Sequence, residues 1–596
     1  MASDLLIGMA GSGGDGIVSA GESLITAAAL EGYHAVMTKS FGPQIRGGES
    51  SFRVRLSTEK VLTPGGLLDI AVALNWDDFL KFGGELPVGG HTVVVYEARS
   101  GVAPDALPLA GVIPAEAIAV PIEEMTKAAT GSDKGKNSVV LGLIGGWLDV
   151  AVGSMRAGIH KKFAKKGEAI LEGNLRAFES GFEFATEHPL KAAKRIDKIA
   201  KAEPRLVTDG NDMAAAAAIF AGCDFFGGYP ITPSTEIMQF LTREIWKYGG
   251  AVLQAEDEIA GVGAAVGASF AGKKAMTATS GPGMSLKTEI LGLASIAELP
   301  LVCVNVQRGG PSTGIPTKSE QADLFQAAFS AHGDSLRPVL APINVEDVFG
   351  IVVEAFNIAE QYQTPVIVLS DQEIGQRKET VTPIDTSAFT LVERLRPTEK
   401  ELEHYERFRL TESGISPITH PGMKGGNHLN SGIEHNEHGS PTASGAMHAK
   451  MVDKRIRKLN PLKARRDLFI VEGRPNAKLA LVAWGSLGGL AMEALHAAVD
   501  AGLDVKLLVP KLLFPVAEEI FDEFFRSVRA GLVVEQSYLA QLYRVLRMYV
   551  TVPKGIVPFA RSGSNPIGVS EIVERLREQS LELQGAIQSR LQPQQG

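Results

Sequence analysis

Short apolar runs alternate with helical segments in three blocks of this chain: residues 4 to about 155, residues 206 to about 380, and from Lys478 onward. The strand-like runs lie at residues 5–9, 51–56, 70–73, 92–96, 275–279, 301–306, 365–370, 479–483, 504–509 and 531–534. A strand that is followed by a helix and then by another strand is typical of parallel sheets covered by helices. The sequence therefore predicts an α/β protein with three α/β domains.

The segments between these blocks have a different composition. Residues 155–205 are rich in Lys, Glu and Ala, which predicts a helix that leads into a surface connection. Residues 385–465 are predicted to begin with a charged helix at 399–409 and to continue as a stretch rich in Gly, His and Asn. The Gln-rich tail after Glu578 is expected to fray.

Bulk composition excludes several classes of protein. With 596 residues, of which 45% are hydrophobic, the chain is long enough for about three or four globular domains. A net charge of −9 argues against a nucleic-acid partner. The N-terminus lacks the basic region of a signal peptide, and no apolar run has the length of a membrane span. We therefore expect a cytoplasmic protein without a membrane partner.

The chain has two cysteines, Cys223 and Cys303, and both lie in apolar segments. We expect buried thiols rather than a disulfide scaffold, which suits a reducing compartment. A [4Fe–4S] cluster takes four thiolates, so this chain alone cannot hold one. Five histidines, at positions 420, 428, 435, 438 and 448, are crowded together, but their spacing matches no standard zinc pattern, and we predict no metal site.

A glycine-rich turn follows the first strand. Residues 11–16 read GSGGDG, so that Gly11, Gly13 and Gly16 match GxGxxG between a strand and a helix at 17–30. This context predicts a phosphate-binding turn, although an ordinary tight turn would look the same. The acidic residue that a NAD site needs about 20 residues further on does not stand out. A NAD-dependent dehydrogenase is therefore disfavoured.

Two further segments favour the binding of a carboxylate. Residues 229–236 read YPITPSTE, where Pro233 suits the first position of a helix and the hydroxyl of Thr232 could cap it. Arg308 follows the strand at 301–306, and ligands of α/β sheets bind outside the carboxyl ends of strands. Thr232 and Arg308 could converge there, and a guanidinium can hold a carboxylate through two hydrogen bonds. The alternatives are an ordinary capped helix and a surface arginine.

Acidic residues open two other predicted elements. Glu256, Asp257 and Glu258 precede a helix of small residues at 261–272, where negative charge in the first turn is favourable in any protein. Residues 317–320 read TKSE, which is the pattern of a capping box.

Taken together, these sequence motifs resemble those of the 2-oxoacid:ferredoxin oxidoreductases, which are thiamine diphosphate enzymes that reduce ferredoxin. YPITPS followed by Glu236 resembles their substrate loop, and residues 11–16, 41–48 and 52–55 resemble their gamma domain. Residues 484–486, 511–515 and 535–537 resemble a transketolase C-terminal-type domain. The resemblance covers nearly the whole chain and implies an alpha-type subunit with a fused N-terminal gamma domain, of the 2-oxoglutarate:ferredoxin oxidoreductase type.

The resemblance also implies the domain limits. A gamma-type domain with a helical connection is expected at 1–190, and a thiamine pyrimidine-binding-type domain at 191–384. An insert or linker at 385–465 would separate these from a transketolase C-terminal-like domain and tail at 466–596.

In such enzymes a glutamate interacts with N1′ of the aminopyrimidine, and the resemblance assigns this role to Glu258, with Glu256 in reserve. It implies that Thr232, Arg308, Thr317 and Lys318 bind substrate. It implies further that Tyr229, Pro230 and Ile231, together with Gly11, Gly13, Gly16 and Arg46, bind cofactors. Family members usually have Gln at the position of Asp15, so this chain departs from the family pattern in the glycine-rich turn.

The GDG at residues 14–16 also matches the start of the thiamine pyrophosphate motif, but no Asn occurs between Gly16 and Asn75. The metal–pyrophosphate half of the cofactor site, with Mg²⁺ and a [4Fe–4S] cluster, is therefore expected in a beta subunit. The cofactors are then thiamine diphosphate, which this chain shares with the beta subunit, and coenzyme A. Ferredoxin and a dimer of alpha–beta heterodimers complete the expected assembly.

The implied reaction converts 2-oxoglutarate, CoA and oxidised ferredoxin into succinyl-CoA, CO₂ and reduced ferredoxin. A low-potential ferredoxin would also allow carboxylation, the direction of CO₂ fixation in a reductive TCA cycle. An oxidoreductase for pyruvate or for branched-chain 2-oxoacids is the enzyme alternative. A non-catalytic regulatory subunit with the same fold is the alternative from another class, and the presence of Thr232, Glu258 and Arg308 argues against it.

Overall fold

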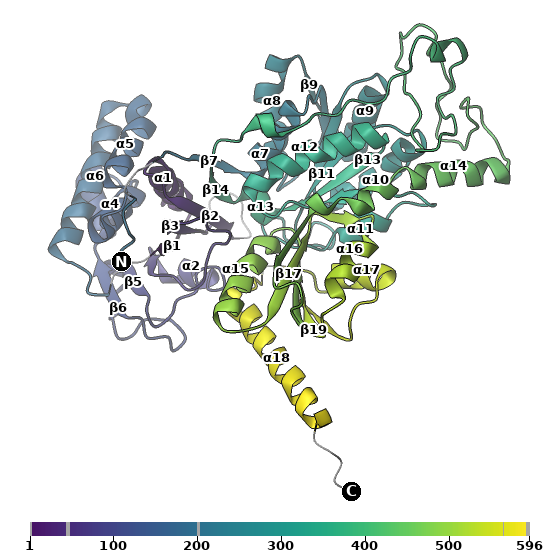
Figure 1. The fold of residues 1–596 in the computed structure, drawn as a ribbon. Coiled ribbons are helices and arrows are strands. Elements are labelled where there is room, and N and C mark those ends of the chain that lie inside the picture. Colours follow the sequence, from purple (N-terminus) through teal and green to yellow (C-terminus); the bar gives the residue numbers. More distant parts are fainter. Residues whose placement is uncertain (1–2, 43–47, 193, 200–202, 564, 592–596) are drawn as a thin grey trace. The chain divides into compact units, whose positions relative to one another are not determined.

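The computed structural model describes residues 3–42, 48–192, 194–199, 203–563 and 565–591. The chain forms two compact units, shown as a ribbon in Figure 1. The first unit comprises Met1–Asp209 and Gln376–Ile384, and the second comprises Gly210–Gly375 and Asp385–Gly596.

The first unit is built on an eight-stranded mixed sheet with the order β6-β5-β4-β1-β3-β2-β14-β7. Its strands are β1 (Asp4–Gly11), β2 (His34–Phe41), β3 (Ser50–Ser57), β4 (Ile70–Ala73), β5 (Val93–Glu97), β6 (Glu116–Val120), β7 (Leu206–Asp209) and β14 (Lys378–Val381). Strands β1, β4, β5 and β6 are parallel, whereas β2, β3, β7 and β14 pair antiparallel to their neighbours. The distant segments β7 and β14 complete this sheet, a pairing that the sequence pattern did not indicate.

Alternation along β1 separates two cores. Leu5, Ile7 and Met9 pack into a large core on one face of the sheet, while Leu6 and Ala10 face a smaller core. Successive side chains of a strand point to opposite faces, so an uninterrupted apolar run requires cover on both sides. The helices of this unit are α1 (Ile17–Leu30), α2 (Trp76–Lys81), α3 (Ile122–Thr130), α4 (Lys136–Leu148), α5 (Val152–Phe163) and α6 (Glu168–Glu187).

The second unit contains a seven-stranded sheet with the order β18-β12-β13-β11-β10-β8-β9. Its strands are β8 (Phe225–Gly228), β9 (Ala251–Gln254), β10 (Ala275–Thr279), β11 (Leu301–Gln307), β12 (Val339–Leu340), β13 (Pro365–Asp371) and β18 (Leu512–Phe514). All pairs are parallel except β12 with β18. Its helices are α7 (Gly210–Phe220), α8 (Thr235–Glu244), α9 (Glu258–Phe270), α10 (Gly281–Ile296), α11 (Leu324–Phe329), α12 (Val345–Tyr362) and α13 (Gln372–Gln376).

A five-stranded sheet with the order β15-β17-β16-β19-β20 completes the second unit. Its strands are β15 (Phe469–Gly473), β16 (Leu479–Ala483), β17 (Val505–Pro510), β19 (Ala530–Glu535) and β20 (Gly555–Ala560), and all but β15 run parallel. The later helices are α14 (Gly445–Arg457), α15 (Leu487–Asp500), α16 (Glu518–Phe525), α17 (Gln541–Tyr549) and α18 (Val569–Leu591). The prediction that the chain frays after Glu578 was wrong, since α18 continues to Leu591.

The charged helix predicted at 399–409 was also wrong, because this segment forms only a 3-10 turn at Glu401–His404. Arg407 and Phe408 turn into the interior and are fully buried. The Arg407 guanidinium donates to the main-chain carbonyls of Ala297 (3.4 Å) and Glu298 (2.6 Å). Tertiary contacts therefore override the local helix propensity of the segment.

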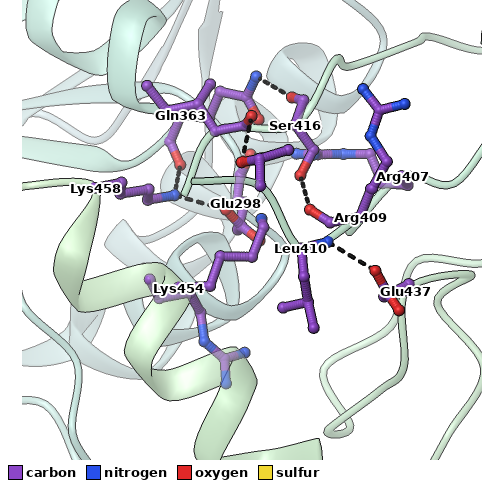
Figure 2. Close-up of polar contacts among 12 residues, drawn as sticks. Glu298, Gln363, Arg407, Arg409, Leu410, Ser416, Glu437, Lys454 and Lys458 are labelled. Atoms are coloured by element: carbon purple, nitrogen blue, oxygen red, sulfur yellow. Dashed lines mark hydrogen bonds and ion pairs between the residues drawn. The ribbon is translucent and has the colours of Figure 1, made fainter. Parts of the chain in front are cut away.

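A buried ionic cluster ties α14 to the turn between α10 and β11 (Figure 2). Lys454 on α14 and Lys458, the residue that caps the C-terminus of this helix, donate to opposite oxygens of Glu298 at 2.5 and 2.8 Å. All three side chains are at most 2% exposed. The Lys458 ammonium also donates to the carbonyl of Gln363 at 3.0 Å. The cations around Glu298 hold the pKa of its carboxyl well below the usual range, against the effect of its own burial.

Both cysteines are buried free thiols, as predicted. Burial raises the pKa of Cys223 to about 12 and that of Cys303 to about 11. In the described part of the chain, every helix is too short or too polar to cross a membrane.

Candidate active site

The loop after β8 carries the YPITPS sequence. Helix α8 begins at Thr235 with Ser234 at its N-cap position, so the prediction that Thr232 caps a helix starting at Pro233 was wrong. The amide and the hydroxyl of Ser234 both donate to the carbonyl of Ile231, at 2.8 and 3.0 Å, which closes a separate turn before the helix. Tyr229 is 40% exposed, whereas Pro230, Ile231 and Thr232 are half-buried.

The structure brings Arg308 and Thr232 together, as the positions of their strands predicted. Arg308 follows the end of β11, is 6% exposed, and donates from Nη1 to the carbonyl of Thr232 at 2.5 Å. Its Nε has no hydrogen-bond partner among the described residues. A buried guanidinium with an unused donor is a suitable partner for a carboxylate.

Glu258 is the first residue of α9 and is 7% exposed. The cap of this helix is Asp257, whose Oδ1 accepts from the amide of Ala260 at 2.7 Å. The Glu258 side chain is therefore not used for capping. It lies against the glycine-rich start of α10: a Cβ placed on Gly283 would lie 3.0 Å from Glu258 Oε1 and 2.7 Å from its Cγ.

These contacts allow a test of whether the site fits an aminopyrimidine. Within the described chain, no residue donates a hydrogen bond to the Glu258 carboxylate, although its residue is almost fully buried. A carboxylate that no described side chain engages is open to a ligand that donates a hydrogen bond to it. The residues present thus fit a group such as aminopyrimidine N1′. Glu256, by contrast, is exposed.

Lys287 lies beneath Glu258 and was missed by sequence reasoning. This fully buried lysine of α10 donates to the Glu258 carbonyl at 3.1 Å and to Thr277 Oγ1 at 3.2 Å. Burial lowers its pKa. The only available signal was a lysine on the apolar helix one turn after Gly283.

Asp323 was missed as well. Its Oδ2 accepts from Asn305 Nδ2 at 2.9 Å, and its backbone amide donates to Gln307 Oε1 at 3.1 Å. A Cβ on Gly281 would lie 3.3 Å from Asp323 Oδ2, whereas Glu258 lies against Gly283. The two carboxyl groups therefore lie at the two ends of the same glycine-rich turn, which brings Asp323 into the candidate site.

The loop that follows Arg308 folds back on itself. The amide of Gly309 donates to the carbonyl of Lys318 at 3.0 Å, and the carbonyl of Gly309 accepts from the amide of Ile315 at 2.8 Å. The main chain of Lys318 therefore lies next to Gly309, the residue that follows Arg308. Thr317 is half-buried there. The predicted capping box at 317–320 was wrong, because α11 begins only at Leu324. The Glu320 carboxylate instead accepts from the amides of Gly310 and Gly563, at 3.2 and 3.1 Å.

The glycine-rich turn of the first unit holds a carboxylate of its own. Asp15 Oδ2 accepts from the amide of Ser12 at 3.0 Å, and Oδ1 pairs with Lys136 at 2.8 Å. Gly16 has a left-handed backbone (φ 78°), and a Cβ there would clash with Asn137 at 2.9 Å. Gly11 is buried and Gly13 is exposed. Arg46 lies outside the described residues. An incoming phosphate would compete with Asp15 for this turn.

In the part of the chain that the structure describes, His, Cys, Asp and Glu side chains form no group that could hold a metal ion. The crowded histidines instead make local contacts. His448 Nδ1 lies 2.5 Å from Glu434 Oε2, and His435 Nδ1 lies 3.0 Å from the carbonyl of Ile433.

Comparison with known sequences gives two family matches. The family described as pyruvate flavodoxin/ferredoxin oxidoreductase, thiamine diP-binding, matches residues 216–454. The family described as pyruvate ferredoxin/flavodoxin oxidoreductase matches residues 7–184.

Relatives match over most of the chain. The 2-oxoglutarate oxidoreductase subunit KorA of Mycobacterium tuberculosis is 32% identical over 91% of this chain and 87% of its own length. The 2-oxoglutarate synthase subunit KorA of Methanocaldococcus jannaschii is 38% identical and covers 56% of this chain and 88% of its own length. A solved structure of 2-oxoglutarate:ferredoxin oxidoreductase from Magnetococcus marinus, with 2-oxoglutarate, coenzyme A and succinyl-CoA bound, is 36% identical. Its TM-score is 0.91, over 97% of this chain and 100% of that chain.

Proposed function

The chain belongs to the 2-oxoacid:ferredoxin oxidoreductases, and from this premise we propose that it is the alpha-type subunit, with a fused gamma domain, of a CoA-dependent 2-oxoglutarate:ferredoxin oxidoreductase. The observation that carries the proposal is the match, at 36% identity over 97% of this chain, to a structure with 2-oxoglutarate, coenzyme A and succinyl-CoA bound. The reaction would convert 2-oxoglutarate and CoA into succinyl-CoA and CO₂ while reducing ferredoxin. Pyruvate or a branched-chain 2-oxoacid is the alternative substrate.

The residues of this chain have distinct parts in this chemistry. Arg308 would hold the carboxylate next to the ketone, with Thr232 beside it, since its guanidinium is buried and has an unused donor. Glu258 would hold a proton at N1′ of the aminopyrimidine, where its unpaired carboxylate fits. Thiamine diphosphate, when bound, supplies the electron sink for decarboxylation. Tyr229, Pro230 and Ile231 would border the cofactor.

The remaining parts of the reaction need a partner. A beta subunit would supply the pyrophosphate site with Mg²⁺ and the [4Fe–4S] cluster, because two buried thiols cannot ligate such a cluster. The expected assembly is a dimer of alpha–beta heterodimers that passes electrons to ferredoxin in the cytoplasm. Gly11, Gly13, Gly16 and Arg46 remain candidates for binding CoA.

We expect the purified chain to be inactive alone. It should show no iron–sulfur absorbance and no reduction of a dye or ferredoxin that depends on a 2-oxoacid, because it lacks a cluster and half of the cofactor site. Adding a beta-type subunit should restore both signals. Turnover by the isolated chain would contradict the proposal.

Arg308→Ala should lower kcat/KM for every 2-oxoacid that the assembled complex accepts. Loss of a charge-assisted hydrogen bond costs about 1.5–3 kcal/mol, which is roughly 10- to 100-fold in kcat/KM. Arg243→Ala, at an exposed position on α8, is the matched control and should leave kcat/KM unchanged. An unchanged kcat/KM in Arg308→Ala would remove Arg308 from substrate binding.

The preferred substrate is tested separately with a panel of 2-oxoacids. The distal carboxylate of 2-oxoglutarate needs its own partner, and the candidates are Lys318, with Thr317 beside it, or a residue of the beta subunit. Lys318→Ala should therefore weaken 2-oxoglutarate more than pyruvate. A wild-type complex with a higher kcat/KM for pyruvate would overturn the substrate assignment while leaving the reaction class intact. Absence of turnover with every 2-oxoacid would favour the non-catalytic subunit.

A further inference from the structure

We propose that Asp323 takes up a proton when a 2-oxoacid binds, because the substrate carboxylate then lies near Asp323 and engages the Arg308 guanidinium. Asp323 is then a positioning residue that acts through Arg308 and makes substrate binding depend on pH. The inference rests on the proposed function in one respect: the ligand carries a carboxylate that Arg308 holds. It does not depend on which 2-oxoacid is preferred.

The backbone around Asp323 is fixed by the domains on both sides. Gln307, at the end of β11, accepts from the Asp323 amide and donates from Nε2 to the carbonyl of Ser370 at 3.1 Å. Gln541 of α17 donates to the carbonyl of Ala322 at 2.6 Å and accepts from the amide of Phe325 at 2.8 Å. These contacts hold the main chain from Ala322 to Phe325 next to the end of β11.

The carboxyl group of Asp323 receives few hydrogen bonds from the surrounding residues. Among the described residues, the side chain that donates to it is Asn305, whose Nδ2 lies 2.9 Å from Asp323 Oδ2. Asn305 is fully buried, and Asp323 is only partly accessible. An ionised carboxylate normally accepts several hydrogen bonds, so a site with one strong donor favours the neutral acid.

The charged groups around Asp323 determine whether substrate binding favours its protonated or its ionised form. Arg308 interacts electrostatically with both Asp323 and Glu258, and Glu320 acts on Asp323 with the same sign as a substrate carboxylate would. Glu320 is held by the amides of Gly310 and Gly563, so it keeps its place. Lys287 is directed to the Glu258 carbonyl and to Thr277. On the neighbouring strand, Asp371 at the end of β13 is a further acid near this edge.

Burial raises the pKa of Asp323 to about 6, with Asn305 and Arg308 opposing the shift and Glu320 adding to it. A bound carboxylate adds like charge and engages Arg308, and both effects raise this pKa further. Near neutral pH, Asp323 is therefore ionised in the free enzyme and protonated in the complex. One proton enters with the substrate, and binding weakens as the pH rises above the pKa of the free enzyme.

The assembled complex tests this through the pH profile of kcat/KM, which reports on free enzyme and free substrate. In the wild type, kcat/KM should fall above pH 6, by up to roughly tenfold per pH unit for a one-proton linkage. Asp323→Asn should lose this limb and keep its low-pH value of kcat/KM. Asp323→Glu should keep the limb with a shifted midpoint, which separates titration from a structural role.

Infrared difference spectra provide a second readout that does not depend on turnover. Adding 2-oxoglutarate to the wild-type complex should produce a protonated-carboxyl band that Asp323→Asn lacks. A wild type without the limb, or an Asp323→Asn variant that retains both limb and band, would overturn the inference. A complex that turns over no 2-oxoacid would instead overturn the proposed function, and with it the ligand assumed for Arg308.

Discussion

Glu258→Gln in the assembled complex should slow exchange of the C2 proton of bound thiamine diphosphate by about 10²–10⁴-fold, the usual worth of a positioned acid–base group. Glutamine keeps the shape of the side chain and much of its hydrogen bonding, but it cannot hold or release the proton at N1′. The surroundings of Glu258 indicate that the substitution removes this proton-holding role without removing a helix cap. The Glu258 carboxylate is buried, caps nothing, and has no partner among the described residues, whereas Asp257 caps the helix.

Exchange into deuterated buffer, followed by acid quench and proton NMR of the released cofactor, measures this rate without any 2-oxoacid. Equilibrium binding of thiamine diphosphate should change little, because the fold around Gly283 is intact. Glu256→Gln is the matched control, since Glu256 is exposed two residues away. Wild-type exchange in Glu258→Gln, or slow exchange in Glu256→Gln, would move the role away from Glu258.

The sequence predicted the buried framework well, because its signals are local. The strands at 70–73, 275–279 and 479–483 and the helix at 17–30 appear with the predicted bounds. Each is an apolar run between glycine-rich or polar turns, so burial and turn chemistry favour the same assignment. The sequence did not predict the pairing of β7 with β14, since the two strands lie far apart in the chain and only register fixes their contact.

Polar residues were predicted less well, because their roles depend on distant partners. The Arg308–Thr232 contact followed from strand ends that meet at one sheet edge. The capping box at 317–320 failed because Glu320 binds the amides of Gly310 and Gly563, one of them from beyond β20. Asp323 gave no sequence signal at all, since its partners Asn305, Gln307 and the turn at Gly281 come from separate elements.

Glu298 shows the same limit in the core. In the sequence, Glu298 is an acidic residue before a strand, a position that suits a surface turn. In the structure its residue is 1% exposed, and its backbone is left-handed (φ 51°). Only the cations from α14 and from residue 407 make this burial possible. The segment that supplies them was predicted as linker and partly as charged helix.

Glu298→Gln should destabilise the second unit by about 3–5 kcal/mol, the range for breaking a buried ion pair by removing one partner. The carboxylate accepts from both Lys454 and Lys458 with almost no access to water. A glutamine offers only one oxygen, and its amide would point a donor at an ammonium. Two buried cations would then lack compensation, next to Arg407, which already binds the Glu298 carbonyl.

The first urea transition of the full chain, together with proteolysis within residues 385–465, measures this loss. Glu244→Gln is the matched control: its pair with Lys247 is exposed (32% and 48%), and such pairs are worth about 0.2–1 kcal/mol. In a Lys454→Met background, Glu298→Gln should cost clearly less, because one of the stranded cations is gone. If Glu298→Gln unfolds like the wild type, the cluster contributes little to stability and α14 must be held by its apolar contacts. Since burial lowers the pKa of Lys454 to about 8, the comparison belongs near pH 7, where Lys454 is charged.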